Sequence, residues 1–245
     1  MSGGLETPRA RLGVVLSASN RWVETYFRAF APAALGIHVT RMHMAGRARE
    51  NLDLAAAQAV EAASLVAEAR VDAIDLQMTG MAMALGAEAE AKVIKTIEEA
   101  TGIQTYTATE SLVEGLAALS VIRVLVITPF DAEANARERA YIEAEGFEFV
   151  ADVALGLGGG PETAAVPPET WVEAALANDS AEVQGVLMSG SNTTMVEAIG
   201  PVEEALGKPV VTSVQAALWA GIRRVKDKLG AFEPAPELGR LMGAL

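Results

Sequence analysis

The sequence predicts an α/β protein made of two similar halves, each a parallel sheet with helices between its strands. Short apolar runs alternate with longer segments of helical periodicity, and this order is typical of parallel sheets with crossover helices. Four apolar runs end in small polar residues directly before a helical segment, as in V-Q-G-V-L-M-S-G-S-N-T-T at 183–194. Residues 102–116 also align without gaps with residues 207–221. We therefore expect two pseudo-symmetric Rossmann-like halves with an active site in the cleft between them.

The first half, residues 1–118, begins with a strand predicted at residues 12–16 and a helix after Asn20. Asparagine is a favourable N-cap, and aromatic residues at helical spacing follow it. Residues 52–69 are rich in alanine and contain neither glycine nor proline, so they predict a long helix. The other elements of this half are strands at residues 37–42, 71–76 and 104–106 and helices at residues 81–100 and 109–119.

The second half, residues 119–212, repeats this alternation. Residues 185–188 form a short apolar run between turn signals, which is typical of a buried parallel strand. The other elements are strands at residues 123–127, 147–154 and 209–211 and helices at residues 131–145, 169–177 and 195–206. A long helix at 213–229 follows, and the proline-containing tail from 233 to 245 predicts one short helix.

The composition argues against several kinds of partner. The chain has 245 residues, a formal net charge of −13 and a pI near 4.7. Binding to nucleic acid or to an anionic membrane surface depends on clustered Lys and Arg, so we expect neither. No apolar run approaches the roughly 20 residues of a membrane helix, and the first residues lack the apolar core of a signal peptide. We therefore expect a cytoplasmic protein.

Polar side chains at the strand ends predict a cradle for a small anion. Asn20, Thr79, Ser191 and Asn192 each stand where a strand ends and a helix begins. Amide and hydroxyl donors, together with free N–H groups of the helix starts, would hold a carboxylate or a developing enediolate. The alternative is that these residues are ordinary N-caps.

Proton transfer in this chain must use a group other than a thiol. The chain contains no cysteine, which removes thiolate nucleophiles, disulfides and most zinc sites, and no metal site is predicted. His43 directly follows the second predicted strand, so it is a candidate acid or base, with a surface histidine as the alternative. Asp75, inside the third strand, fits a structural hydrogen-bonding role equally well. Ser191 would act as a nucleophile only with a base beside it, and the sequence shows none.

A glycine-rich stretch, L-G-L-G-G-G-P at 155–161, does not match a dinucleotide-binding fingerprint. It runs into Pro161 instead of a helix start, and the acidic residue required about 20 positions on is absent from the end of a second strand. We expect a mobile loop over the cleft, because glycines permit hinge motion. Arg41, Arg47 and Arg49 flank His43 and would attract an anionic substrate, although solvated surface arginines are the more common case.

Several stretches resemble one family in order along the chain. They are V-V-L-S-A-S-N, I-H-V-T-R-M-H-M, L-Q-M-T-G-M-A-M-A-L-G, V-L-V-I-T-P-F-D-A-E-A-N, L-M-S-G-S-N-T-T-M-V-E-A-I and G-K-P-V-V-T-S-V-Q-A-A-L-W-A. The chain resembles the maleate isomerase and arylmalonate decarboxylase branch of the aspartate/glutamate racemase superfamily. The resemblance implies two Rossmann-like halves, with the helices of residues 213–245 packed back on the first half. It also implies a cofactor-free site between the halves.

The chain departs from the family pattern at the thiol positions. The resemblance places the catalytic cysteines just past the third strand of each half, where this chain has Met78 and Gly190. The tyrosine of the T-P-Y motif is Phe130, so its hydroxyl is missing. The polar positions that match the pattern are Asn20, Thr79 and Asn135. Three explanations stay open: a pocket reshaped for another substrate, a pocket that binds without reacting, and a laboratory replacement of the cysteines.

We therefore predict a site formed by strand-end residues of both halves. The predicted catalytic positions are His43, Met78, Gly190 and Ser191. The predicted substrate-binding positions are Ser17, Asn20, Thr79, Gly80, Thr128, Phe130, Asn135, Asn192 and Ser213.

The resemblance implies a cofactor-independent isomerase for a small carboxylic or dicarboxylic acid, with maleate-type cis–trans isomerisation or a racemase-like reaction as the first interpretation. One alternative is an arylmalonate-type decarboxylase, a lyase. Another is a non-catalytic protein that binds a small acid. The expected partners are this small anionic substrate and further copies of the chain in a homo-oligomer.

Overall fold

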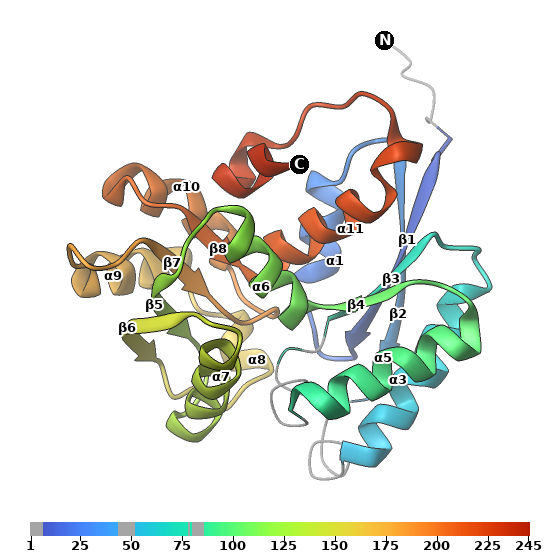
Figure 1. The fold of residues 1–245 in the computed structure, drawn as a ribbon, viewed down its shortest axis with the longest axis horizontal. Coiled ribbons are helices and arrows are strands. Elements are labelled where there is room, and N and C mark those ends of the chain that lie inside the picture. The colour runs from blue at the N-terminus through green and yellow to red at the C-terminus, as the bar shows by residue number, and fades with distance from the viewer. Residues whose placement is uncertain (1–6, 44–51, 78, 80–85) are drawn as a thin grey trace.

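Two four-stranded parallel sheets form the framework of the protein (Figure 1). The computed structural model describes residues 7–43, 52–77, 79 and 86–245. Within these residues the first sheet has the strand order β2-β1-β3-β4, and the second has the order β6-β5-β7-β8. In each sheet the first strand of the half lies between the second and the third, so the two halves share one topology. The predicted α/β fold with two similar halves is confirmed.

Every predicted strand is present, with ends that differ by a few residues. The strands of the first sheet are β1 (Ala10–Ser17), β2 (Leu35–Met42), β3 (Ala73–Gln77) and β4 (Thr105–Thr107). Those of the second are β5 (Arg123–Thr128), β6 (Glu148–Ala154), β7 (Gly185–Met188) and β8 (Val210–Thr212). All residues of β3 and β7 are buried, which explains why both read as continuous runs rather than as an alternating pattern.

Helices connect the strands on both faces of each sheet. In the first half they are α1 (Val23–Phe30), α3 (Leu52–Ala67), α5 (Ala87–Thr101) and α6 (Ala108–Ala118). The second half contains α7 (Ala132–Ala144), α8 (Pro161–Ala164), α9 (Pro168–Asn178) and α10 (Met195–Leu206), and α11 (Ser213–Leu229) follows it. The tail forms two 3₁₀ turns, Pro236–Leu238 and Arg240–Ala244, instead of one short helix.

Two corrections concern helix starts. Pro161 opens the short helix α8, where the sequence predicted no helix, because proline is well suited to the first position of a helix. The first residues of the helix predicted at 81–100 lie outside the described residues, and α5 is described from Ala87.

Helices α6 and α11 begin with the same capping arrangement. The hydroxyl of Thr107 accepts a hydrogen bond from the backbone N–H of Glu110, whose side chain accepts one from the backbone N–H of Thr107. Thr212 and Gln215 form the same capping box at the start of α11. These reciprocal caps satisfy otherwise free donors at both helix starts. The repeated sequence at 102–116 and 207–221 thus corresponds to a repeated structure.

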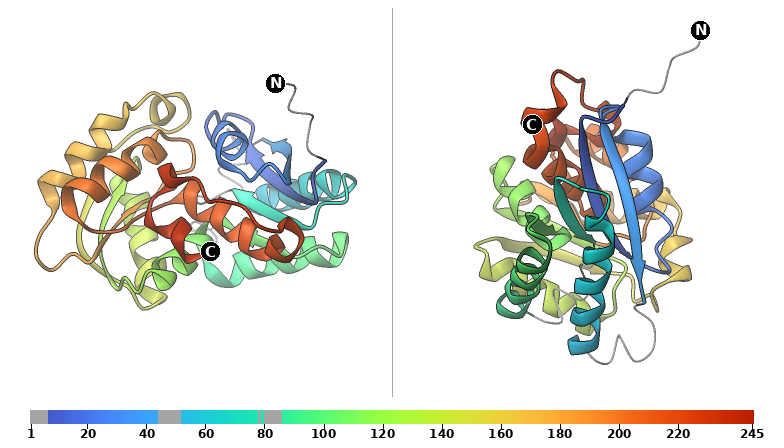
Figure 2. Two further views of the ribbon diagram at one scale, coloured as in Figure 1. Left: turned by 90° about the horizontal axis from the view of Figure 1, so that it is seen from above. Right: turned by 90° about the vertical axis from the view of Figure 1, so that its right-hand side faces the viewer.

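Helix α11 carries the chain from the second half back onto the first. It packs against α6 and against β1 and β3 of the first sheet, and Figures 1 and 2 show it running between the two halves. The Tyr106 hydroxyl of β4 donates a hydrogen bond to the backbone carbonyl of Ala217 at 2.9 Å. This packing supports the prediction that the C-terminal helices complete the first half, while the domain boundaries at 118/119 and 212/213 stay a prediction.

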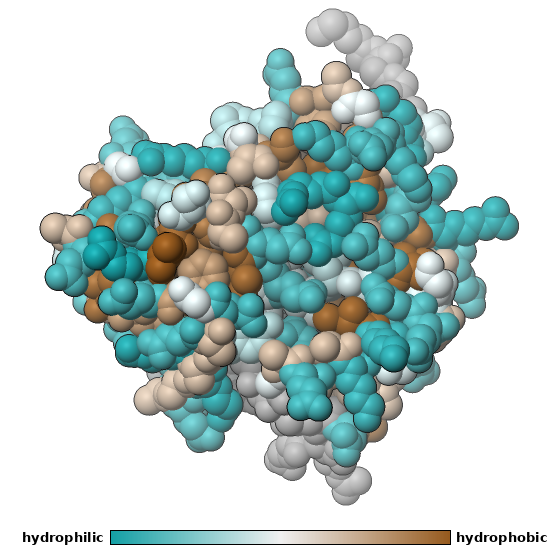
Figure 3. All heavy atoms as spheres, in the orientation of Figure 1, coloured by the Kyte–Doolittle hydropathy of each residue, from teal (hydrophilic) through white to brown (hydrophobic). Residues whose placement is uncertain are grey.

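The surface shown in Figure 3 is mainly hydrophilic, with small apolar patches between charged side chains. Large exposed apolar residues include Leu65 on α3, Leu176 on α9 and Ile122 just before β5. Across the part of the chain that the structure describes, none of the helices combines the length and the apolar character that a bilayer-spanning segment requires.

Replacing Gly221 with alanine should destabilise the protein. The Cβ of an alanine at this position of α11 would lie 2.5 Å from the Tyr106 hydroxyl oxygen and 2.8 Å from a methyl group of Leu12. Overpacking of this kind costs about 1–3 kcal/mol, which for a chain of this size lowers the melting temperature by about 2–4 °C per kcal/mol. Thermal unfolding measures the change.

Gly243→Ala, at an exposed position of the 3₁₀ turn Arg240–Ala244, is the control, because beyond its chain neighbours and the local backbone no atom lies within 4 Å of the added Cβ. It should be neutral or should stabilise the protein by up to about 1 kcal/mol. Equal melting temperatures for the two variants would contradict close packing of α11 on the first sheet.

Candidate active site

Two turns, one from each half, meet at the carboxyl ends of their strands. The first follows β1 and ends at Asn20, and the second follows β7 and contains Ser191 and Asn192. The Asn20 side-chain amide donates a hydrogen bond to the backbone carbonyl of Ser191 at 3.3 Å. The backbone N–H of Arg21 donates to Oδ1 of Asn192 at 2.8 Å. The structure thus brings together three of the four residues predicted to form the anion cradle.

Asn20 has two tasks at once. Its Oδ1 accepts hydrogen bonds from the backbone N–H groups of Trp22 at 3.1 Å and Val23 at 3.0 Å, which is the action of an N-cap. Its Nδ2 reaches across to the other half. Capping and cradle formation, which the sequence left as alternatives, are therefore compatible for this side chain.

The turn after β7 presents unused backbone donors. The N–H of Gly190 donates to the Ser213 hydroxyl at 3.0 Å. Within the described residues, the N–H groups of Ser191 and Asn192 donate no hydrogen bond. Both residues are partly exposed and lie just before α10. Free N–H groups at a helix start attract anions.

Gly190 gives this turn its shape. Its φ of +150° is in the range that other residues rarely adopt. An added Cβ would lie 3.0 Å from the Pro129 ring and 3.3 Å from a methyl group of Thr193. A cysteine at this position would therefore require Pro129 or the turn to move, so the backbone here is adapted to glycine.

The T-P-F segment is held by its own hydrogen bonds. The Thr128 hydroxyl donates to Oδ1 of Asn135 at 2.8 Å and accepts a bond from the N–H of Phe130 at 3.3 Å. Nδ2 of Asn135 donates to Asp152 at 2.7 Å. These contacts fix the turn between β5 and α7, and direct substrate contacts of Thr128, Phe130 and Asn135 stay a prediction.

The glycine-rich segment lies against these turns. The N–H groups of Leu155, Gly156 and Leu157 donate to the backbone carbonyls of residues 128, 130 and 129, respectively. The Asn192 side-chain amide donates to the Gly160 carbonyl at 3.0 Å, and the Trp22 indole donates to the Ala164 carbonyl at 2.9 Å. The segment therefore bridges both halves beside the site, while its predicted mobility is untested.

The remaining predicted residues differ in their surroundings. His43 is exposed directly after β2, whose last residue pairs with Ser17. Thr79 is buried, and its hydroxyl makes no hydrogen bond to a described residue. Arg41 donates to the Asn20 carbonyl at 2.8 Å and pairs with Glu24 at 2.9 Å, so it braces the Asn20 turn. The predicted residues Met78 and Gly80, and with them Arg47 and Arg49, lie outside the described residues.

Sequence reasoning missed a buried acid on α7. Glu138 is completely buried, with the Ser189 hydroxyl beside it, and burial raises the pKa of its carboxyl to about 8. Glutamate three residues after Asn135 falls on the same helical face, and this spacing was the available signal. Asp75 on β3 is a buried acid of the first half: burial raises its pKa to about 8, against opposing effects of Gln77 and Arg224.

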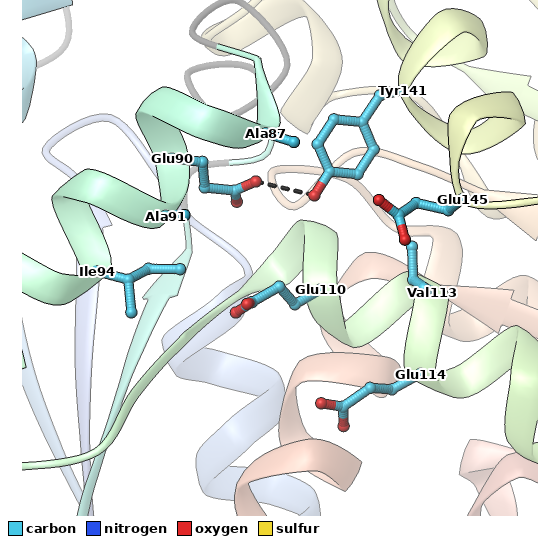
Figure 4. A pocket seen from close by; sticks show the side chains of 9 residues that line it. All are labelled: Ala87, Glu90, Ala91, Ile94, Glu110, Val113, Glu114, Tyr141 and Glu145. Carbon is cyan, nitrogen blue, oxygen red and sulfur yellow. Dashed lines mark hydrogen bonds between the residues drawn. The ribbon is translucent and has the colours of Figure 1, made fainter.

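A separate hollow of about 300 Å³ between α5, α6 and α7 is unsuited to an anion (Figure 4). Glu90, Glu110 and Glu145 line it, and the Tyr141 hydroxyl donates to Glu90 at 2.9 Å. Burial raises the pKa of Glu90 and of Glu110. The carboxylates repel an acid ligand, so the two polar turns are the better candidate site.

The family model described as arylmalonate decarboxylase matches residues 18–239. The chain belongs to the arylmalonate decarboxylase family. It is 30% identical over 170 residues to the arylmalonate decarboxylase of Bordetella bronchiseptica, with 69% of this chain and 70% of the relative covered. It is 28% identical over 242 residues to the maleate isomerase of Nocardia farcinica, with 95% of each covered.

One solved structure that is similar to this chain contains a covalent intermediate. It is a mutant of the Nocardia farcinica maleate cis-trans isomerase with a covalently bound succinylcysteine intermediate. The TM-score is 0.81 and the identity 26%, with 89% of this chain and 93% of that chain covered. That protein uses a cysteine in a covalent intermediate, whereas this member of the arylmalonate decarboxylase family contains none.

Asp75→Asn should weaken the dependence of stability on pH. The pKa of Asp75 is about 8 in the folded protein against an ordinary value of 3.8. Its contribution to stability is therefore complete below pH 4 and is lost as the pH rises to about 8. At pH 9 the variant should be more stable than the wild type by about 1–3 kcal/mol, because no charge has to be buried.

Urea unfolding at pH 5 and pH 9 measures this difference. Asp227→Asn, at an exposed position of α11, is the control and should leave the pH dependence unchanged. An equal stability difference between Asp75→Asn and the wild type at both pH values would contradict a neutral buried Asp75.

Proposed function

We propose that this protein is a cofactor-independent isomerase or lyase that acts on a small carboxylic or dicarboxylic acid. Maleate-type cis–trans isomerisation is the first candidate, because the maleate isomerase of Nocardia farcinica aligns over 95% of this chain. The observation that carries the proposal is the meeting of the Asn20 turn with the Ser191–Asn192 turn, whose backbone donors are free.

These donors would hold one carboxylate of the substrate. The N–H groups of Ser191 and Asn192 lie in the turn that leads into α10, which begins at Met195 and whose dipole favours negative charge at its start. As charge moves onto the carboxylate during the reaction, such preorganised donors stabilise the enediolate. Thr79, whose hydroxyl has no partner among the described residues, is a further donor in this proposal.

His43 is the proposed acid or base. It is exposed and follows the β2 residue that pairs with Ser17, three residues before Asn20. An imidazole has one nitrogen that can accept a proton and one that can donate it, which suits a side chain that acts as acid or base.

Arylmalonate-type decarboxylation is the second candidate, because the family model described as arylmalonate decarboxylase matches residues 18–239. Isomerisation in the relative involves a covalent succinylcysteine. Loss of carbon dioxide from a malonate needs stabilisation of the enediolate and a proton donor, and it needs no covalent adduct. A thiol-free site with free N–H donors satisfies the first of these requirements. A third candidate, binding of the acid without reaction, holds if no proton donor reaches the cradle.

The wider biological setting follows from the same proposal. The proposed partner is a small anionic carboxylate. Assembly into a homo-oligomer and a cytoplasmic location stay predictions from the sequence.

An NMR screen in heavy water tests the function. Maleate, substituted malonates and amino-dicarboxylates are each mixed with the protein, and binding, deuterium incorporation and conversion are followed together. We expect conversion of at least one acid and a loss of deuterium incorporation in His43→Asn. Binding without conversion or exchange would favour the binding protein, and no binding of any acid would contradict the proposal.

Asn20→Ser should weaken acid binding without unfolding the protein. Serine keeps the N-cap function but removes the amide that donates to the Ser191 carbonyl. We expect an affinity at least about 10-fold lower in calorimetry, since a lost hydrogen bond at a binding site costs about 1–3 kcal/mol. Asn178→Ser, at an exposed position of α9, is the control. Equal affinities of both variants and the wild type would contradict the cradle.

A further inference from the structure

Glu138 is a buried acid that has no charged partner among the described residues. Its side chain is 0% exposed, and neither carboxyl oxygen makes a regular hydrogen bond with a described residue. The Ser189 hydroxyl lies beside it and is likewise completely buried and without a regular hydrogen bond. A carboxylate buried without a cation is unstable, so the carboxyl group remains protonated near neutral pH.

Other ionisable groups near α7 are occupied elsewhere. Asp152 on β6 accepts hydrogen bonds from Asn135 and Arg139. Tyr141 donates to Glu90 of α5. Among the described residues, burial and the Ser189 hydroxyl are the causes that set the pKa of Glu138 at about 8, the first raising it and the second lowering it.

Ser189 connects this acid to the proposed site. It directly follows β7, and its backbone N–H donates to the Ile127 carbonyl of β5 at 3.0 Å. The next residue, Gly190, donates its N–H to the Ser213 hydroxyl of α11. The turn is therefore held by β5 and α11 through its backbone, and α7 contacts it through Glu138 and Ser189.

The first half contains a counterpart of this contact. In the first half, Leu76 of β3 pairs with Thr107, which caps α6. In the second half, Met188 of β7 pairs with Thr212, which caps α11. Gln77 of the first half therefore corresponds to Ser189 of the second. Gln77 is 2% exposed and lies beside Asp75, which is 0% exposed and also has no regular hydrogen bond among the described residues.

In both halves, therefore, a buried acid lies beside the side chain at the end of the third strand. These pairs are Asp75 with Gln77 and Glu138 with Ser189. The two acids come from different elements, Asp75 from β3 and Glu138 from α7. The duplication alone does not account for this recurrence, because the two acids do not occupy corresponding positions.

We propose that Glu138 is a positioning residue that holds the turn of Ser189 and Gly190 by hydrogen bonding to the Ser189 hydroxyl. In its protonated form it donates to Ser189, and the turn then presents the N–H groups of Ser191 and Asn192 to the substrate carboxylate. Loss of the proton removes the donor and places a negative charge behind the anion site. The inference rests on the proposed function for its effect on turnover, but the contact itself is testable without a substrate.

The first experiment follows the Cα resonance of Gly190 by NMR of the full-length, ¹³C-labelled protein between pH 6 and pH 9.5. We expect the wild-type resonance to shift with a midpoint near pH 8 and the Glu138→Gln resonance to stay constant over this range. Glu143→Gln, at an exposed position of the same helix, should titrate like the wild type. A wild-type resonance that does not titrate, or one that titrates equally in Glu138→Gln, would overturn the proposal.

The second experiment measures kcat and KM against pH on an acid that the wild type converts. Glu138→Leu should lower kcat at pH 7 by about 10-fold or more, because Ser189 loses its donor. Glu138→Gln should recover most of this loss and should lack the wild-type decline above pH 8, since the amide donates at every pH. If Glu138→Gln is as impaired as Glu138→Leu, the proposal fails. If the wild type converts no acid, the proposed function fails and the NMR titration alone decides the positioning role.

Discussion

The meeting of two turns from opposite halves is the contact on which the proposed site depends. Residues 171 positions apart in the chain are joined through the Asn20 amide and through Oδ1 of Asn192. Neither half alone has a complete set of polar groups, because the free backbone donors come from the second half and the bridging amide from the first. Each contact joins a side-chain group of one turn to a backbone group of the other, and among the described residues the N–H groups of Ser191 and Asn192 stay available for a ligand.

The rest of the fold places these turns. In a parallel sheet the carboxyl ends of all strands lie at one edge, so each half brings its turns to that edge. Helices α6 and α11 pack together between the halves, and α11 lies on the first sheet. The Tyr106 hydroxyl and the absence of a side chain at Gly221 allow this close approach. The relative position of the sheets therefore follows from helix packing far from the turns.

The proposed site contains no thiol, because the chain has no cysteine. The φ of Gly190 and its close contact with Pro129 both favour glycine at this turn. Replacing Gly190 with cysteine would therefore also require the backbone or Pro129 to move. Each half buries an acid with a raised pKa, Asp75 in the first and Glu138 in the second. Buried neutral acids are costly to ionise, and they are kept where hydrogen-bond donation outweighs that cost.

The sequence by itself determined the local structure and the family. Strand runs such as 185–188, the cap at Asn20 and the repeat of residues 102–116 at 207–221 depend on residues close in the chain, so periodicity, capping chemistry and self-comparison reveal them. The motif order also indicated the family, and the position of Gly190 followed from it.

Only the tertiary structure decided which polar groups lie close together and which already have hydrogen-bond partners within the protein. The packing of elements that are distant in the chain decides three features of the site region. They are the pairing of Asn20 with Ser191, the contact of Arg41 with the Asn20 turn and the burial of Glu138 beside Ser189. Whether a side chain is free, bonded or buried is a property of its neighbours in space. A single sequence does not specify those neighbours, because each helix face can pack in more than one way until the sheets are in place.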